Sequence, residues 1–219
     1  MVQAVLFDLD ETLLDRSRSV RLFLQDQHAR WPGAWAHVPV ETLQARFWEL
    51  DAFGYVHKSI VYRQLLEEFD VRELSAESLI DEYYSRCNRF AQGFPGLVET
   101  LATLRERGLK LGIVTNGLTE MQSLGISVLG LTDLVDAVLI SEAEGLRKPD
   151  PALFHLAAER LGVPANRCLF VGDHPRNDID GARQAGMKTV WFPNSVAWIE
   201  ELKPADHEIQ SLPELLHLL

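Results

Sequence analysis

The chain has 219 residues, 47% of them hydrophobic and 24% charged, which fits one globular domain or a domain with a sizeable insertion. Its 32 acidic and 21 basic residues give a formal net charge of −11, which argues against a protein that coats nucleic acid or binds an anionic membrane surface. The two cysteines, Cys87 and Cys168, lack a metal-binding spacing, so we expect both to be reduced and buried. With no apolar run of membrane-spanning length and no apparent secretory signal, we expect a cytoplasmic protein.

The first predicted element is a short strand, Ala4–Phe7, whose apolar residues run without alternation. Similar strands are predicted at Lys110–Val114, Ala137–Ile140 and Cys168–Val171, with a weaker candidate at Thr189–Phe192. Continuous apolar strands are typical of a sheet covered on both faces. Helix-period segments alternate with strands from residue 97 onward, and two of them end at Gly108 and Gly162. This alternation predicts an α/β fold with a doubly wound parallel sheet.

Residues 17–92 lack this alternation of strands and helices, because four segments with apolar residues at helical spacing follow one another without a strand. We therefore predict a helical insertion over residues 17–92 in an α/β core formed by residues 1–16 and 93–219. We expect the aromatic residues Trp48, Phe53 and Tyr55 to be buried within the insertion. The C-terminal segment 212–219 is expected to form a short helix that packs on the core.

Polar residues follow each of the first four strands. They are Asp8 and Asp10 after the first strand, Thr115, Asn116 and Gly117 after the second, Lys148 after the third, and Asp173 and Asp178 after the fourth. An isolated pair of aspartates two residues apart is more often a solvated turn. However, the carboxyl ends of parallel strands share one edge of the sheet, where such folds bind ligands. The sequence therefore predicts that these residues converge on one crevice.

The assembled side chains suit phosphoryl chemistry. Asp8, Asp10 and Asp173 offer the hard oxygen ligands that Mg²⁺ prefers. Lys148 supplies a positive charge, and Thr115 with the amides around Asn116 and Gly117 supplies hydrogen-bond donors. Such a set can receive a phosphoryl group, with one carboxylate attacking phosphorus and the other transferring protons.

Two nearby residues are open to other interpretations. Asp178 is as well explained by an N-cap for a helix over Ile179–Ala185 as by a place in the metal shell. His174 lies beside Asp173, but an exposed loop histidine is the more common case.

The four clusters resemble those of the haloacid dehalogenase (HAD) superfamily of hydrolases, in particular its phosphatases. The resemblance is carried by the segments Asp8-Leu9-Asp10-Glu11-Thr12, Thr115-Asn116, Lys148-Pro149-Asp150-Pro151 and Gly172-Asp173-His174-Pro175-Arg176-Asn177-Asp178. Each segment alone is weakly to moderately specific, but all four in this order form a highly specific pattern. The resemblance also implies a Rossmann-like core, and the helical insertion lies where this family has its small α-helical cap.

The resemblance implies a role for each matching residue. Asp8 would be the nucleophile and a metal ligand, and Asp10 the general acid and base, which in similar proteins reaches the metal through its backbone carbonyl. Thr115 and Asn116 would hold phosphoryl oxygens, and Lys148 would neutralise the phosphoryl group and Asp8. Asp173 would ligate Mg²⁺, Asp178 would support the metal's water shell, and Thr12 would brace the loop after Asp10.

The expected activity is Mg²⁺-dependent hydrolysis of a small phosphorylated metabolite through an aspartyl-phosphate intermediate. Asp10 disfavours the dehalogenase branch, which attacks carbon and needs no proton donor at that position. A HAD-type phosphomutase acting on sugar phosphates would keep the same motifs, and a non-catalytic phosphate-dependent binding protein would keep the pocket. Substrate identity, phosphatase against mutase, the specificity residues of the cap and the oligomeric state are not decided by the motifs. The five tryptophans leave room for an exposed apolar patch, so a homodimer stays open.

Overall fold

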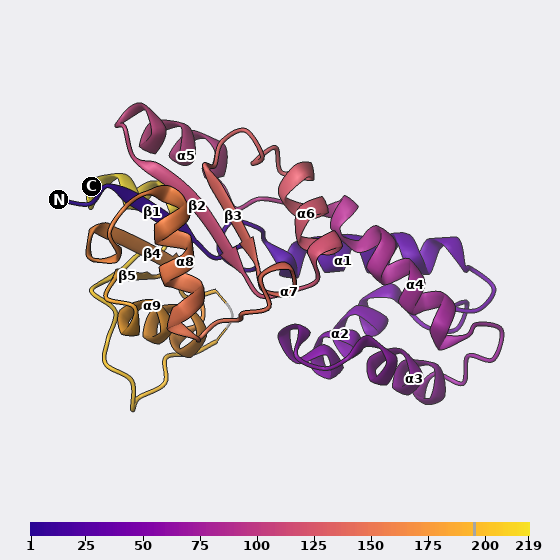
Figure 1. Ribbon diagram of the computed structural model, residues 1–219. Coiled ribbons are helices and arrows are strands. Elements are labelled where there is room, and N and C mark those ends of the chain that lie inside the picture. The colour runs from indigo at the N-terminus through magenta and orange to yellow at the C-terminus, as the bar shows by residue number, and fades with distance from the viewer. Residues whose placement is uncertain (195) are drawn as a thin grey trace. The chain divides into compact units, whose positions relative to one another are not determined.

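The computed structural model describes residues 1–194 and 196–219 (Figure 1). The described residues contain six strands that form one parallel sheet in the order β3-β2-β1-β4-β5-β6. The strands are β1 (Ala4–Phe7), β2 (Lys110–Thr115), β3 (Ala137–Ile140), β4 (Cys168–Gly172), β5 (Lys188–Trp191) and β6 (His207–Glu208). The fold-class prediction of a doubly wound parallel α/β sheet is confirmed. The two-residue strand β6 was not predicted, because two exposed polar residues carry no apolar signal.

By its own contacts the chain divides into two compact units, Met1–Arg16 with Gln92–Leu219 and Ser17–Ala91. The first unit holds the whole sheet and its helices. These are α5 (Leu97–Glu106), α6 (Thr119–Val128), α7 (Ser141–Glu144), α8 (Pro151–Leu161) and α9 (Gly181–Gln184), with 3₁₀ helices η3 (Ala165–Arg167) and η5 (Leu212–His217) and the π-helix η4 (Pro175–Asp180). The backbone carbonyl of Leu216 in η5 accepts a hydrogen bond from the side chain of Arg107, which ties the C-terminal segment to the end of α5.

The sheet is buried because its strands are apolar on both sides. Ala4 and Leu6 of β1 belong to a core that includes Leu153, Phe154 and Ala157 of α8. Val5 and Phe7 alternate with them and are also fully buried, as expected for a strand covered on both faces. Figure 1 shows α8 and α5 on different sides of the strands.

The strand order reverses direction at β1, and this brings three strand ends together. Phe7 at the end of β1 lies opposite Ile113 of β2 and Val171 of β4 in the parallel register. The residues that follow β1, β2 and β4 therefore leave the sheet at the same edge. In open parallel sheets this reversal point is where ligands bind.

The second unit consists of helices packed on an aromatic core. It contains α1 (Arg16–Arg30, whose first residue belongs to the sheet unit), α2 (Val40–Asp51), α3 (Lys58–Glu68) and α4 (Ala76–Arg86), with 3₁₀ helices η1 (Ala52–Gly54) and η2 (Cys87–Phe90). Phe47 and Tyr83 have stacked rings at 6.1 Å between centroids, and Tyr83 meets Phe23 edge-on at 5.6 Å. These four α-helices form at the segments with helical spacing that the sequence contains.

The expectation that Trp48, Phe53 and Tyr55 are buried is wrong for Phe53 and Tyr55. Phe53 is 43% exposed and Tyr55 is 62% exposed. Phe53 has a left-handed backbone with φ 57°, so the turn after α2 points its ring outward instead of continuing the helix. Trp48 is partly buried and meets the Phe53 ring edge-on at 5.9 Å.

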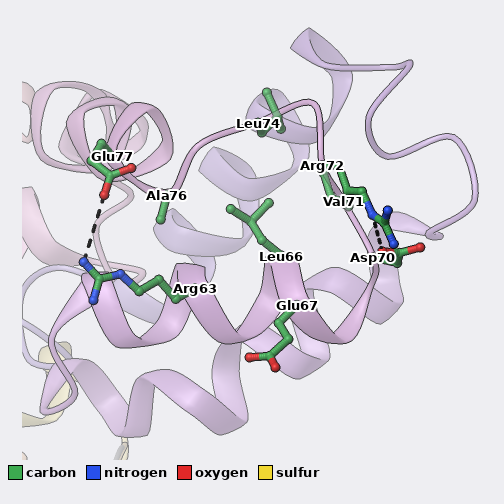
Figure 2. A pocket seen from close by; sticks show the side chains of 9 residues that line it. All are labelled: Arg63, Leu66, Glu67, Asp70, Val71, Arg72, Leu74, Ala76 and Glu77. Atoms are coloured by element: carbon green, nitrogen blue, oxygen red, sulfur yellow. Dashed lines mark hydrogen bonds and ion pairs between the residues drawn. The ribbon is translucent and has the colours of Figure 1, made fainter.

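A shallow hollow of about 480 Å³ lies between α3 and the start of α4 (Figure 2). Five charged side chains line it, and four of them form two pairs. Arg63 lies 4.0 Å from Glu77, and Arg72 lies 2.8 Å from Asp70. Because these charges offset one another at an exposed surface, this hollow lacks the concentrated buried charge found at the strand ends.

Candidate active site

Lys148 lies between two carboxylates at the carboxyl edge of the sheet. Its ammonium nitrogen is 2.5 Å from Asp8 Oδ1 and 2.7 Å from Asp178 Oδ1, and the residue is only 3% exposed. Asp8 follows β1 directly, and its backbone N–H donates to the carbonyl of Val171, which fixes it at the end of the sheet. Three residues from distant parts of the chain, 8, 148 and 178, thus share one buried ionic cluster, as the sequence predicted for the strand ends.

The electrostatics of the cluster show an excess of negative charge. Burial raises the pKa of Asp8 to about 7, and Asp178 adds to this although the Lys148 ammonium acts against it. For Lys148 burial works to lower the pKa, but attraction from Asp178 and Asp8 outweighs it and the pKa is raised. Lys148 therefore stays protonated, and one lysine does not fully neutralise its acidic neighbours.

A third buried carboxylate, Asp173, completes a group that can hold a cation. Asp8, Asp173 and Asp178 each offer one oxygen within 4.8 Å of the others. If all three are ionised, the cluster holds three negative charges and the single positive charge of Lys148, which leaves two negative charges uncompensated. Buried charges need partners, and oxygen ligands suit a hard divalent cation, so the donor set fits Mg²⁺. The side chain of Asp10 is not among these three oxygen donors.

The loop that carries Asp173 and Asp178 leads into the π-helix η4. His174 caps this helix, because its Nδ1 accepts hydrogen bonds from the backbone N–H groups of Arg176 and Asn177. Burial lowers the pKa of His174, which agrees with a neutral ring whose Nδ1 is an acceptor. The interpretation of His174 as an exposed loop histidine is therefore wrong.

Asp178 lies inside η4 and does not cap a helix starting at Ile179. Its Oδ2 accepts from the backbone N–H of His174 at 3.0 Å, while its other oxygen faces Lys148. The cap interpretation is wrong because the helical turn begins earlier, at Pro175, where histidine supplies the capping acceptor. One carboxylate oxygen of Asp178 thus contacts Lys148 in the candidate site, and the other holds the backbone of the loop that carries His174.

The residues after β2 are connected to the lysine loop and to α7. The Asn116 side chain donates to the Lys148 carbonyl at 3.0 Å and accepts from the Lys148 backbone N–H at 2.9 Å. The Gly117 backbone N–H donates to Ser141 Oγ at 3.0 Å. The Asn116 side chain therefore fixes the backbone from which Lys148 projects, and the Gly117 amide is engaged within the protein. Their contact with substrate stays a prediction.

Asp10 reaches a partner that the sequence did not indicate, Gln122 in α6. The Gln122 amide nitrogen is 3.0 Å from Asp10 Oδ2 and 2.8 Å from Thr115 Oγ1. The contact joins residues 112 positions apart in the chain. The only sequence signal was a glutamine shortly after Thr115-Asn116-Gly117, and this is too weak to single it out.

The loop after Asp10 is held by backbone bonds and by one distant side chain. The Glu11 N–H donates to the Leu14 carbonyl at 2.7 Å, and Asn194 donates to the Glu11 carbonyl at 3.0 Å. Thr12, which the resemblance implied would brace this loop, is fully buried, and its hydroxyl has no hydrogen-bond partner among the described residues.

Comparison with known proteins agrees with this fold. A family model described as haloacid dehalogenase-like hydrolase matches residues 2–186. A phosphoserine phosphatase of Thermus thermophilus is 32% identical over 198 residues, covering 88% of this chain and 77% of the relative. A glyceraldehyde 3-phosphate phosphatase of Pyrococcus abyssi is 33% identical over 197 residues, covering 88% of this chain and 82% of the relative.

A solved structure of the HAD-hydrolase YfnB from Bacillus subtilis, described as bound to magnesium, is 27% identical. It superimposes with a TM-score of 0.72 over 100% of this chain and 98% of that chain.

A parallel sheet with buried carboxylates and a lysine at its carboxyl edge defines an α/β protein with a charged site at its strand ends. This chain belongs to the haloacid dehalogenase-like hydrolase family, as the motifs suggested. None of the described helices combines the length and apolarity needed to cross a membrane. The expectations about nucleic acid, compartment and oligomeric state stay predictions.

Proposed function

We propose that the protein is a Mg²⁺-dependent phosphomonoester hydrolase that acts on a small phosphorylated metabolite through an aspartyl-phosphate on Asp8. The observation that carries the proposal is the buried cluster in which Asp8, Asp173 and Asp178 lie together and Lys148 pairs with Asp8 and Asp178. It is supported by relatives named as phosphatases and by a similar solved structure described as bound to magnesium.

In the proposed first half-reaction, a carboxylate oxygen of Asp8 attacks phosphorus while the bond from phosphorus to the ester oxygen breaks. Asp10 gives its proton to the departing oxygen, so the alcohol leaves neutral. In the second half-reaction a water attacks phosphorus, Asp10 takes its proton, and the Asp8 carboxylate is released with inorganic phosphate. Lys148 and the Thr115 hydroxyl face the negative charge of the transferring group.

Asp8, Asp173 and Asp178 are the residues that would hold or support Mg²⁺, with Asp10 contributing through its backbone. When bound, the ion neutralises phosphoryl oxygens and so lets one anion approach another. Residues 17–91 are proposed to form the cap that excludes water from the reaction and selects the substrate. The two relatives named above differ in their substrates, so we propose only the class of small phosphomonoesters.

The first test is release of inorganic phosphate from a broad panel of phosphomonoesters, with Mg²⁺ and with a chelator. We expect turnover that needs the metal, and Asp8→Asn should lower it by about 10³-fold or more because an amide cannot attack phosphorus. Asp133→Asn makes the same chemical change at an exposed position and should leave turnover unchanged. Isomerisation of sugar phosphates without phosphate release would indicate a mutase, and no turnover with any ester would indicate a binding protein.

A further inference from the structure

Gln122 occupies a buried position between two groups of the site. It lies in α6, is 4% exposed, and places one amide nitrogen 3.0 Å from Asp10 Oδ2 and 2.8 Å from Thr115 Oγ1. The NH₂ group has two hydrogens, so it can serve both acceptors at the same time.

The chemistry of the three groups fixes the direction of these hydrogen bonds. Gln122 turns its NH₂ group toward Asp10 and donates to Oδ2, because a carbonyl oxygen placed there would face another oxygen. The same NH₂ group then donates to the Thr115 oxygen. Since that hydroxyl is used as an acceptor, its own hydrogen is directed elsewhere and can be donated to a ligand.

The space for this side chain is provided by Gly117. A Cβ atom at Gly117 would lie 2.8 Å from Gln122 Cγ and 2.9 Å from its Cδ. Real carbon atoms do not approach so closely, so any larger residue at 117 would displace the glutamine. The chain thus leaves room for an amide group at this point beside Asp10.

We propose that Gln122 is a positioning residue for proton transfer, a role that rests on the hydrolysis proposed above. It holds Asp10 by Oδ2, so the proton that Asp10 gives and takes is carried on Oδ1. It also orients the Thr115 hydroxyl hydrogen toward the phosphoryl group. Gln122 itself acts through these two residues and needs no contact with the substrate.

The test is Gln122→Met, which keeps the length of the side chain and removes the donor. Hydrolysis is measured with p-nitrophenyl phosphate, whose leaving group needs no protonation, and with the best alkyl phosphate of the panel, whose leaving group does. We expect kcat for the alkyl ester to fall about 10-fold to 100-fold more than kcat for the aryl ester, because only the alkyl reaction depends on a well-placed acid. Gln122→Leu provides a second variant lacking the donor if the first does not fold.

Two controls separate positioning from a general loss of structure. Gln184 in α9 is exposed and donates to Asp180 Oδ2 at 2.7 Å, so Gln184→Met removes a similar bond away from the site and should leave both activities unchanged. In an Asp10→Asn background, Gln122→Met should change the alkyl-to-aryl ratio by no more than about twofold, since the residue through which it acts is already disabled.

Equal losses for both esters, or an undiminished change of the ratio in the Asp10→Asn background, would overturn the positioning role while leaving the hydrolase proposal intact. A wild-type protein that releases phosphate from neither ester would instead overturn the proposed function, and this role with it.

Discussion

Lys148 shows how one side chain determines whether the site can exist in the folded chain. It is buried against Asp8 and Asp178, two carboxylates that would otherwise face each other without a counter-charge. An ionised group that is buried without a partner destabilises the folded state far more than one exposed to water. The pairing of Lys148 with Asp8 and Asp178 therefore contributes to stability as well as to chemistry.

We expect Lys148→Met to lower the free energy of unfolding by about 3 kcal/mol or more, because it leaves two buried carboxylates uncompensated. Mg²⁺ should recover more stability in this variant than in the wild type, since a cation can replace the lost charge. Denaturant unfolding with and without Mg²⁺ measures both effects. Lys110→Met is the matched control, because Lys110 pairs with Asp136 at 3.1 Å with its side chain 55% exposed, and should cost less than about 1 kcal/mol. A similar loss in both variants would contradict the argument.

The sequence predicted those site residues that the order of the strands brings together. It did not predict those whose position depends on how helices and side chains pack. Asp8, Lys148 and Asp173 each follow a buried strand, so topology alone brought them to one edge. Gln122 could not be predicted in this way, because its contact with Asp10 depends on how α6 packs against the loop after β1. His174 was misread because histidine is an uncommon capping residue, and its role follows only from the direction of its ring.

At the scale of the elements, the sheet was predictable because its strands are continuously apolar. Ala4–Phe7 and Ala137–Ile140 have the predicted bounds, and β2 and β4 extend one residue beyond them. The π-helix η4 was not predicted, since an i→i+5 turn has no sequence period that differs clearly from an α-helix. The position of η4 nevertheless determines where Asp178 lies, because Asp178 is one of its residues.

The close approach of η4 to the end of β4 requires glycine at position 172. A Cβ atom there would lie 2.5 Å from Asp178 Cβ and 2.6 Å from its Oδ2. We expect Gly172→Ala to move Asp178 away from Lys148, costing about 1 to 3 kcal/mol of stability and weakening Mg²⁺ binding, which calorimetry and thermal unfolding would measure.

The matched control for this change is Gly33→Ala. A Cβ at Gly33 meets nothing within 4 Å, so stability should change by no more than about 0.5 kcal/mol. If Gly172→Ala bound Mg²⁺ as tightly as Gly33→Ala does, the packing of η4 on β4 would not be what places Asp178.

At the scale of the whole molecule, the two units have separate cores, and the chain passes between them at two adjacent points. The Asp15 backbone N–H donates to the Gln92 carbonyl at 2.8 Å, and Leu14 forms an antiparallel bridge with Gly93. The unit formed by Met1–Arg16 and Gln92–Leu219 contains the sheet and the cluster around Lys148. It also contains Gln122. The ends left by removing residues 17–91 therefore lie close enough for a short linker, whose closure costs little entropy.

We expect a variant in which a short glycine-serine linker replaces residues 17–91 to fold cooperatively and to be stabilised by Mg²⁺, because its core and metal ligands are intact. Turnover of small phosphomonoesters should fall strongly, because the proposed cap would no longer exclude water or hold the substrate. Thermal unfolding with and without Mg²⁺ and phosphate release compared with the full chain measure the two parts separately. Full turnover in the shortened protein would refute the cap role, and loss of cooperative unfolding would show that the sheet unit depends on the helical unit for its stability.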